Sequence, residues 1–162
     1  MSDVLPAPRD VFRRLDLWLA FGLGSGLAPK APGTWGTLVG TLIFIPLLLV
    51  SPILALMVLL LGMAVGSWLC QRAADWAGVH DHGGIVWDEF VGVWLALMAL
   101  PEQSWTWWLA AFVGFRFFDI VKPWPIRWVD RHVHGGVGIM LDDVLAAVMT
   151  VIVIWLAVAI IG

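Results

Sequence analysis

The chain has 162 residues, of which 61% are hydrophobic and only 13% are charged. An ordinary soluble domain is about half apolar and about a quarter charged, and a chain of this length has too little interior to hide such an apolar excess. This composition disfavours a soluble helical domain, and the net charge of −3 argues against nucleic acid as a partner. We expect lipid to cover the apolar surface.

The N-terminal region places basic residues before its first apolar stretch. Arg9, Arg13 and Arg14 precede the segment 15–28, which Asp16 and three glycines interrupt. We expect this segment to be retained as a short interfacial or re-entrant helix with its basic side toward lipid headgroups.

The next segment, GLGSGLAPKAPGTWG at residues 22–36, is too broken by glycine and proline for a regular helix. Its backbone N–H groups, with Ser25, Gly26, Lys30 and Thr34, form a candidate phosphate cradle. The same composition also fits a flexible re-entrant turn. The segment lacks the Gly-Lys-Ser/Thr ending of a Walker A loop, so we do not expect nucleotide binding.

No charged residue lies between Lys30 and Arg72, and this span is long enough for two membrane crossings joined near Ser51 and Pro52. Three further apolar segments follow, at residues 85–100, 104–121 and 144–161. They are apolar on all sides, which is typical of helices and not of barrel strands. The sequence therefore predicts an all-α, polytopic bundle of about five spanning helices, with residues 1–162 forming a single domain.

The basic residues are distributed unequally between the two sides of this predicted bundle. If the N-terminus is cytoplasmic, the loops on the opposite side contain no Lys or Arg, as the positive-inside rule requires. The residues that then fall on the cytoplasmic side are Arg9, Arg13, Arg14, Lys30, Arg72, Lys122, Arg127 and Arg131.

Adjacent carboxylates, Asp88 and Glu89, follow the polar stretch HDHGGIVW at the start of the third apolar segment. Adjacent acids repel each other unless a cation lies beside them. Oxygen ligands suit Mg²⁺, which also accepts phosphate oxygens from a substrate. His80 and His82 make a weak zinc signal without a cysteine partner. We interpret them as supporting or solvated loop residues.

The fourth segment ends in FRFFDIVKPWP, where Arg116, Asp119 and Lys122 follow one another at intervals of three. This spacing places each beside the next on a helix, before Pro123 ends the regular turn. The ladder has two interpretations: a self-neutralising set of ion pairs, or a phosphate site in which Arg116 and Lys122 hold phosphoryl oxygens.

A second acidic pair, Asp142 and Asp143, opens the fifth segment. One such pair could cap a helix N-terminus, but two pairs at the same membrane face indicate a metal site. We expect Gly135, Gly136 and Gly138 to form a supple entry loop before the crossing, with His132 and His134 as loop residues.

These four clusters resemble motifs of the phosphatidylglycerophosphatase A family in its proteobacterial form. The resemblance rests on GSGLAPKAPGTWGTL, HDHGGIVWDEFVG, FRFFDIVKPWPIRWVDRHVHGG and GIMLDDVLA, and it covers most of the chain. It implies a bacterial inner-membrane enzyme that uses Mg²⁺ to hydrolyse phosphatidylglycerophosphate, a phospholipid substrate, to phosphatidylglycerol and phosphate. It also implies an acidic core with basic and hydroxyl residues beside it: Asp88, Glu89, Asp119, Asp142, Asp143, Arg116, Lys122, Ser25 and Thr34.

Within that resemblance, our hypothesis is that Asp88, Glu89 and one or both of Asp142 and Asp143 hold Mg²⁺, while Asp119 acts as a base or orients water. A covalent aspartyl-phosphate route stays open. The alternative from a different class is a transporter or channel that uses the buried acids and Arg116 as an ion or proton relay. The sequence leaves the oligomeric state and the selectivity among lipid phosphates open.

Overall fold

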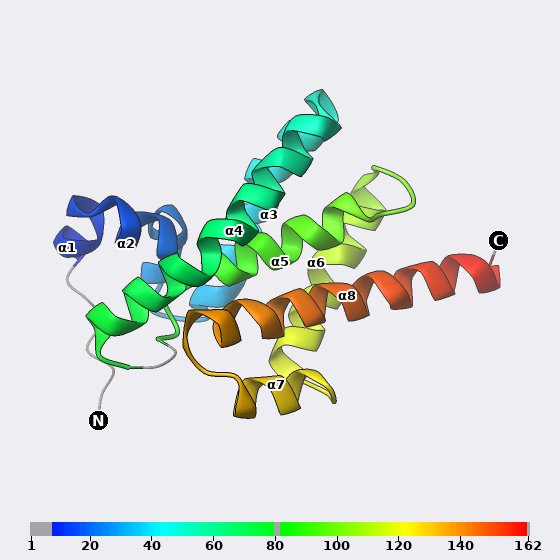
Figure 1. The fold of residues 1–162 in the computed structure, drawn as a ribbon. Helices are drawn as coiled ribbons and strands as arrows, with labels where there is room; N and C mark the ends of the chain where they lie inside the picture. Colours follow the sequence, from blue (N-terminus) through cyan, green and yellow to red (C-terminus); the bar gives the residue numbers. More distant parts are fainter. Residues whose placement is uncertain (1–7, 80–81, 162) are drawn as a thin grey trace.

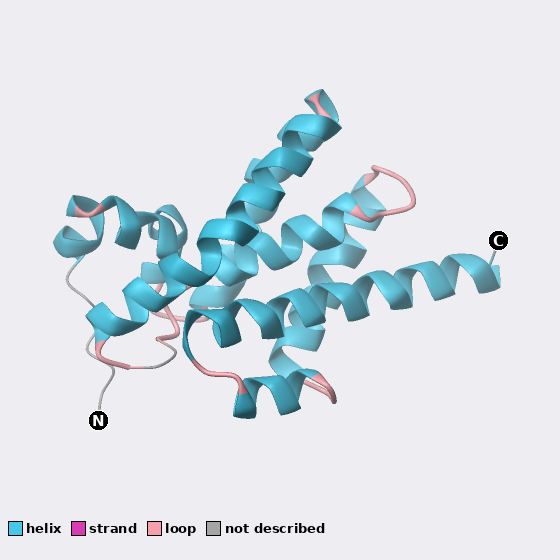
Figure 2. Cartoon of the chain, viewed as in Figure 1, coloured by secondary structure: helices cyan, strands magenta, loops and turns pink. Residues whose placement is uncertain are grey.

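The structure is a computed structural model that describes residues 8–79 and 82–161. In this part of the chain all regular structure is helical and no strand occurs (Figure 2). The elements are α1 (Pro8–Arg13), α2 (Leu15–Ala20), the 3₁₀ helix η1 (Gly22–Leu27), α3 (Pro32–Val50), α4 (Pro52–Ala77), α5 (Trp87–Met98), α6 (Trp105–Val121), α7 (Ile126–His132) and α8 (Gly135–Ile161).

Helices α3 and α4 form the predicted helical hairpin. Ser51 separates them, its hydroxyl accepts a hydrogen bond from the Leu54 N–H at 3.3 Å, and Pro52 begins α4. Both residues suit these positions, because a serine N-cap satisfies a free N–H and proline fits the first helical turn. The hairpin prediction is confirmed.

Three of the described helices, α3, α4 and α8, are long and apolar enough to cross a membrane. Helix α5 has 12 residues and α6 has 17, which correspond to about 18 Å and about 26 Å at 1.5 Å per residue. Both are shorter than a hydrocarbon core of about 30 Å. The all-helical membrane fold is confirmed, and the number of five crossings stays a prediction.

Helix α5 lies in the middle of the bundle, in contact with α3, α4, α6 and α8 (Figure 1). Two indole N–H groups fix it there: Trp87 donates to the Gly62 carbonyl of α4 at 3.1 Å, and Trp94 donates to the Gly40 carbonyl of α3 at 3.0 Å. The glycines allow the close approach, since small residues let helix backbones come together. This packing holds the acidic first turn of α5 inside the protein.

Helix α8 begins earlier than the sequence analysis predicts. The expected entry loop is wrong, because Gly136 and Gly138 lie in the first turns of the helix. The reason is close packing on α4: the Gly136 N–H donates to Gln71 Oε1 at 2.8 Å, and a Cβ at Gly136 would collide with the Ser67 carbonyl oxygen. The acidic pair of α8 therefore lies inside a helix and not at its mouth.

This packing predicts that Gly136→Ala destabilises the protein strongly. A Cβ there would meet backbone atoms of α4, and overpacking of this kind costs about 1–3 kcal/mol, or more where backbone cannot move. We expect a clearly lower melting temperature in detergent. Gly83→Ala is the matched control, since a Cβ at Gly83 would have no neighbour within 4 Å. Equal melting temperatures for the two variants would contradict the close packing.

The helix ends sort into two groups (Figure 1). Because consecutive long helices alternate in direction, the starts of α3, α5 and α8 gather with the ends of α4 and α6. The N-terminal helices and α7 also lie at this end, which we name the charged end. The hairpin tip, the α5–α6 connection and the C-terminus extend away from it. All four sequence clusters thus meet at one end of the bundle.

Candidate metal and phosphate site

Three carboxylates form the centre of the candidate site. Asp88 and Glu89, in the first turn of α5, and Asp143 of α8 each offer one oxygen, and these oxygens lie within 4.8 Å of one another. All three residues are buried, with 8%, 9% and 2% of their surface exposed. We call them the acid core.

Each acid-core residue has a buried oxygen without a hydrogen-bond partner among the described residues: Asp88 Oδ1, Glu89 Oε2 and Asp143 Oδ2. Buried polar atoms are nearly always satisfied, so such orphans require an explanation. Buried like charges repel each other, and a divalent cation between them would both neutralise and coordinate them. The donor set, all carboxylate oxygen, fits Mg²⁺.

Arg116 of α6 is the basic partner of the acid core. Its guanidinium forms an ion pair with Asp119, one turn along α6, and lies 3.6 Å from Glu89 Oε1. Asp119 in turn adjoins Asp143. The start of α3 also reaches this point, because a Cβ at Gly33 would collide with Glu89 and lie 3.1 Å from both terminal nitrogens of Arg116. Four helices therefore meet around one guanidinium and its carboxylates.

The predicted ladder along α6 holds for its first two members but not for Lys122. Lys122 caps α6 in a left-handed conformation, with φ of 45°, so its side chain leaves the helix face. Its Nζ lies 2.7 Å from Asp130 of α7 and 2.5 Å from Asp142 of α8. Burial lowers the pKa of Lys122, but these two carboxylates together hold it above its ordinary value. Lys122 therefore stays charged and ties three helices together.

Asp142 and Asp143 point to different partners. Successive residues of a helix are about 100° apart around its axis, so Asp143 faces the acid core while Asp142 faces Lys122. Asp142 remains a predicted ligand of the metal, but its charge already has a partner. The acid core therefore consists of Asp88 and Glu89 from the first turn of α5 and Asp143 from α8.

The structure divides the predicted phosphate cradle. Its first part is irregular as predicted, but residues 32–36 already belong to α3. Ser25 donates to the Gly22 carbonyl at 2.8 Å, and Gly26 packs on the carbonyl of Gly84. Lys30 is exposed. Thr34 lies in the first turn of α3, directly after Gly33, the residue that approaches Glu89 and Arg116.

The histidines take structural positions. His82 is buried, its Nδ1 accepts the Gly84 N–H at 3.0 Å, and its ring lies 5.8 Å from that of Phe21. The interpretation of His82 as a solvated residue is therefore wrong, while His80 lies outside the described residues. His132 ends α7 instead of lying in a loop, and its ring stacks on Trp128 at 4.7 Å.

Sequence reasoning missed three residues of this region. Cys70 of α4 is completely buried and interacts electrostatically with Asp88, although the sequence suggests only a small hydrophobe. Gly33 and Asp130 lie within motifs already singled out, yet only tertiary packing shows that one touches Arg116 and the other holds Lys122.

Comparison with known proteins assigns this arrangement to a family. The family model described as Phosphatidylglycerophosphatase A matches residues 18–158, which include all of the charged clusters above. The chain belongs to the phosphatidylglycerophosphatase A family. It is therefore a phosphatase, its relatives reported below are bacterial, and three of its own described helices are long and apolar enough to cross a membrane.

The curated relatives agree with the family model. The phosphatidylglycerophosphatase A of Escherichia coli is 49% identical over 158 residues, covering 91% of this chain and 89% of the relative. That of Haemophilus influenzae is 54% identical over 138 residues, covering 85% of each. A Bacteroides thetaiotaomicron protein, whose name proposes a phosphatidylinositol-3-phosphatase, is 41% identical over 155 residues, covering 91% of this chain and 96% of the relative. No solved structure matches the chain.

Proposed function

We propose that this enzyme hydrolyses the terminal phosphomonoester of phosphatidylglycerophosphate, giving phosphatidylglycerol and inorganic phosphate, with Mg²⁺ as its cofactor. The observation that carries the proposal is the acid core, three buried carboxylates with unpartnered oxygens beside a guanidinium. The names of the two closely similar proteobacterial relatives support the substrate.

Asp88, Glu89 and Asp143 would hold the ion, with Asp142 as the further candidate. Bound Mg²⁺ supplies positive charge that polarises the phosphoryl oxygens. It also offsets the repulsion among the buried carboxylates. A bound cation would in addition attract the anionic phosphate of the substrate to this site.

The chain's own groups do the remaining work in this proposal. Arg116 neutralises charge on the transferring phosphoryl group, since phosphoryl transfer depends mainly on positioning and electrostatics. Asp119 orients that guanidinium and accepts the proton of the attacking water. The bond from phosphorus to the glycerol oxygen breaks, and this oxygen takes up a proton. Lys122 adds positive charge at the edge of the site, where it holds Asp142.

The proposed orientation places the charged end at the cytoplasmic side of the bacterial inner membrane, with the N-terminus in the cytoplasm. Arg72 lies in the last two turns of α4, Lys122 caps α6, and Arg127 and Arg131 lie on α7, so these basic residues share the charged end. The positive-inside rule then places this end in the cytoplasm. Five crossings are compatible with this arrangement if the polar ends of α5 and α6 lie within the headgroup region.

A transporter or channel is the less favoured function. A charge relay requires ionisable groups at mid-membrane depth, with broken helices around them. Here the acids lie in the first turn of α5, near the end of α6 and in the third turn of α8, within the half of the bundle that belongs to the charged end. Membership of the phosphatidylglycerophosphatase A family also favours a phosphatase over a transporter or channel.

The test is phosphate release by the purified protein in detergent. With phosphatidylglycerophosphate we expect release that requires Mg²⁺ and stops on addition of EDTA. Phosphatidic acid and phosphatidylinositol 3-phosphate, supplied at the same surface concentration, measure selectivity among headgroups. Absence of release from phosphatidylglycerophosphate would overturn the activity, and undiminished release in EDTA would overturn the metal requirement.

A further inference from the structure

Two pockets that share Leu19 as a lining residue follow one side of α4, and we call the two together the channel. Its upper part is a pocket of about 510 Å³ between α2 and the end of α4, lined in part by Arg14, Asp16, Trp68 and Arg72. Its lower part is a pocket of about 300 Å³ between α4 and α5. Leu19 lines both, so the two pockets adjoin.

The lower pocket is apolar and follows one stripe of α4. Val58, Leu61 and Val65 line it at helical spacing, and Trp68 and Arg72 continue the stripe into the upper pocket. The indoles of Trp87 and Trp94 form its floor, and their N–H groups are already bonded to backbone carbonyls. The lower pocket therefore suits a hydrocarbon chain and offers no free hydrogen-bond donor from its two indoles.

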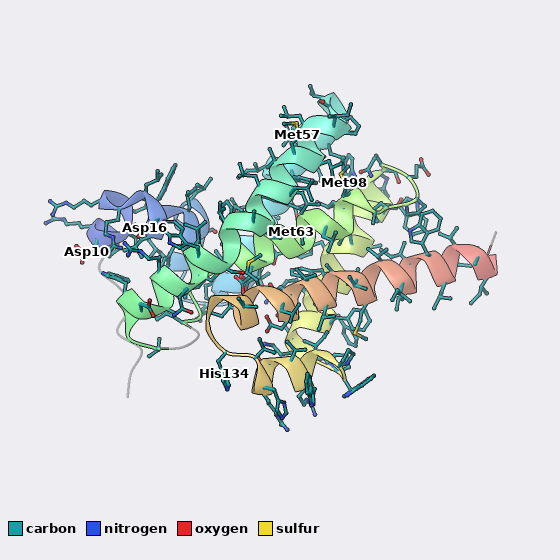
Figure 3. The ribbon with its side chains drawn as sticks, in the orientation of Figure 1. Asp10, Asp16, Met57, Met63, Met98 and His134 are labelled. Carbon is teal, nitrogen blue, oxygen red and sulfur yellow. The ribbon has the colours of Figure 1, made fainter. Side chains whose placement is uncertain are left out.

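The upper pocket carries an excess of positive charge. Asp16 lies 2.7 Å from Arg14 and 3.4 Å from Arg72, whose side chains remain 40% and 52% exposed. The hydrogen bond from Arg14 lowers the pKa of Asp16, so this carboxylate stays ionised at neutral pH. One carboxylate between two guanidiniums leaves a net charge of +1. Each guanidinium has five N–H donors, more than the single carboxylate can accept, so further N–H groups can bind an anion. Figure 3 shows Asp16 on the N-terminal helices beside α4.

This channel is separate from the site of hydrolysis. Residues two positions apart in an α-helix lie about 200° apart around its axis. Trp68 and Arg72, each two positions from Cys70, therefore lie on the opposite face of α4 from Cys70, the residue beside Asp88. The Arg72 guanidinium lies 5.8 Å from the centre of the Trp68 ring, which holds it on this outer face. Helix α4 thus lies between the upper pocket and the acid core, and the indole of Trp87 closes the lower pocket on its α5 side.

We propose that this channel binds an intact anionic phospholipid, with its phosphodiester between Arg14 and Arg72 and one acyl chain along the stripe that ends at Val58. The length fits, because the 14 residues from 58 to 72 rise about 21 Å, and half of a bilayer of about 40–45 Å, headgroup regions included, spans about the same distance. The charge fits too, since a phosphodiester carries the single negative charge that complements +1. The bound lipid joins the N-terminal helices to α4 and takes no part in hydrolysis.

The experiment measures lipid binding to the full-length protein in detergent by the shift of its melting temperature. Phosphatidylglycerol and phosphatidylcholine are titrated in EDTA at fixed ionic strength, so that Mg²⁺ does not recruit lipid to the acid core. We expect phosphatidylglycerol to stabilise the protein and phosphatidylcholine to stabilise it much less. The double variant Arg14→Gln/Arg72→Gln should bind phosphatidylglycerol about 10- to 30-fold more weakly.

Two matched controls separate this site from general attraction to anionic surfaces. Arg9→Gln/Arg13→Gln removes the same charge from exposed positions of α1 and should leave binding unchanged. Val65→Phe, which fills the lower pocket, should weaken binding, whereas Leu60→Phe, at an exposed position about 140° around α4 from Val65, should not. Phosphate release by the Arg14/Arg72 double variant should stay within about twofold of the unmodified protein.

Several results would overturn the proposal. Equal stabilisation by phosphatidylcholine removes the charge requirement, and equal stabilisation by soluble glycerol 3-phosphate removes the acyl-chain pocket. Equal weakening by the Arg9/Arg13 control shows nonspecific attraction only. A tenfold loss of hydrolysis in the Arg14/Arg72 variant, in a protein that still folds, would place these residues on the substrate path instead.

Discussion

Replacing Asp143 with Asn is expected to raise the Mg²⁺ concentration for half-maximal hydrolysis and to lower kcat more than about 100-fold. The carboxylate lies in the acid core with Asp88 and Glu89. Loss of a residue that only hydrogen-bonds to a metal ligand typically reduces metal affinity or activity about 10- to 100-fold, so loss of a ligand itself should exceed that range. The measurement is phosphate release as a function of Mg²⁺ concentration, with the melting temperature as a check on folding.

The adjacent residue provides the comparison. Asp142→Asn makes the same chemical change one position earlier, where the carboxylate meets Lys122 at 2.5 Å. If Asp142 acts through Lys122, this variant should lose turnover but keep the Mg²⁺ dependence of the unmodified protein. A shift equal to that of Asp143→Asn would instead make Asp142 a ligand. Asp10→Asn, on an exposed position of α1, should change neither quantity.

Arg116→Gln should abolish most activity and also destabilise the protein. The substitution leaves Glu89 and Asp119 buried without their cation, and breaking a buried ion pair by removing one partner costs about 3–5 kcal/mol. Loss of positive charge at the phosphoryl group should lower kcat about 100- to 1000-fold, as removal of comparable stabilising donors does.

A second variant separates these two effects. Arg116→Gln/Asp119→Asn removes one of the stranded charges, so its melting temperature should recover part of the loss while its activity does not. Arg116→Lys keeps the charge but lacks the planar fork, and should restore stability better than turnover. Full activity in Arg116→Gln or in Arg116→Gln/Asp119→Asn would exclude a role of Arg116 in catalysis.

Much of the fold could be predicted because its determinants are local. A charge-free run with Ser51 and Pro52 in its middle leaves few alternatives to a hairpin, since lipid-exposed backbone must be hydrogen-bonded internally. Intervals of three residues likewise place Arg116 beside Asp119 wherever α6 packs.

The remaining features depend on contacts between helices. Glycine normally weakens a helix, so residues 135–138 suggest a loop until the carbonyl of Ser67 is known to lie against Gly136. The partner of Lys122 depends on a left-handed turn that brings α7 and α8 within reach. No pattern in the sequence distinguishes Asp142 from Asp143, because their difference arises from the rotation of α8 against its neighbours.

If α6 crosses the membrane, as the sequence predicts, its length also affects the lipid around it. Its 17 residues span about 26 Å, and Leu109, Val113 and Phe117 are exposed along it. A helix shorter than the hydrocarbon core is accommodated by local thinning of the bilayer, at a modest cost per ångström of mismatch. Headgroups next to α6 would then lie deeper than those next to α4 or α8. The bilayer itself would lower a phosphomonoester toward Arg116 and Asp119, so membrane thickness should influence the rate of hydrolysis.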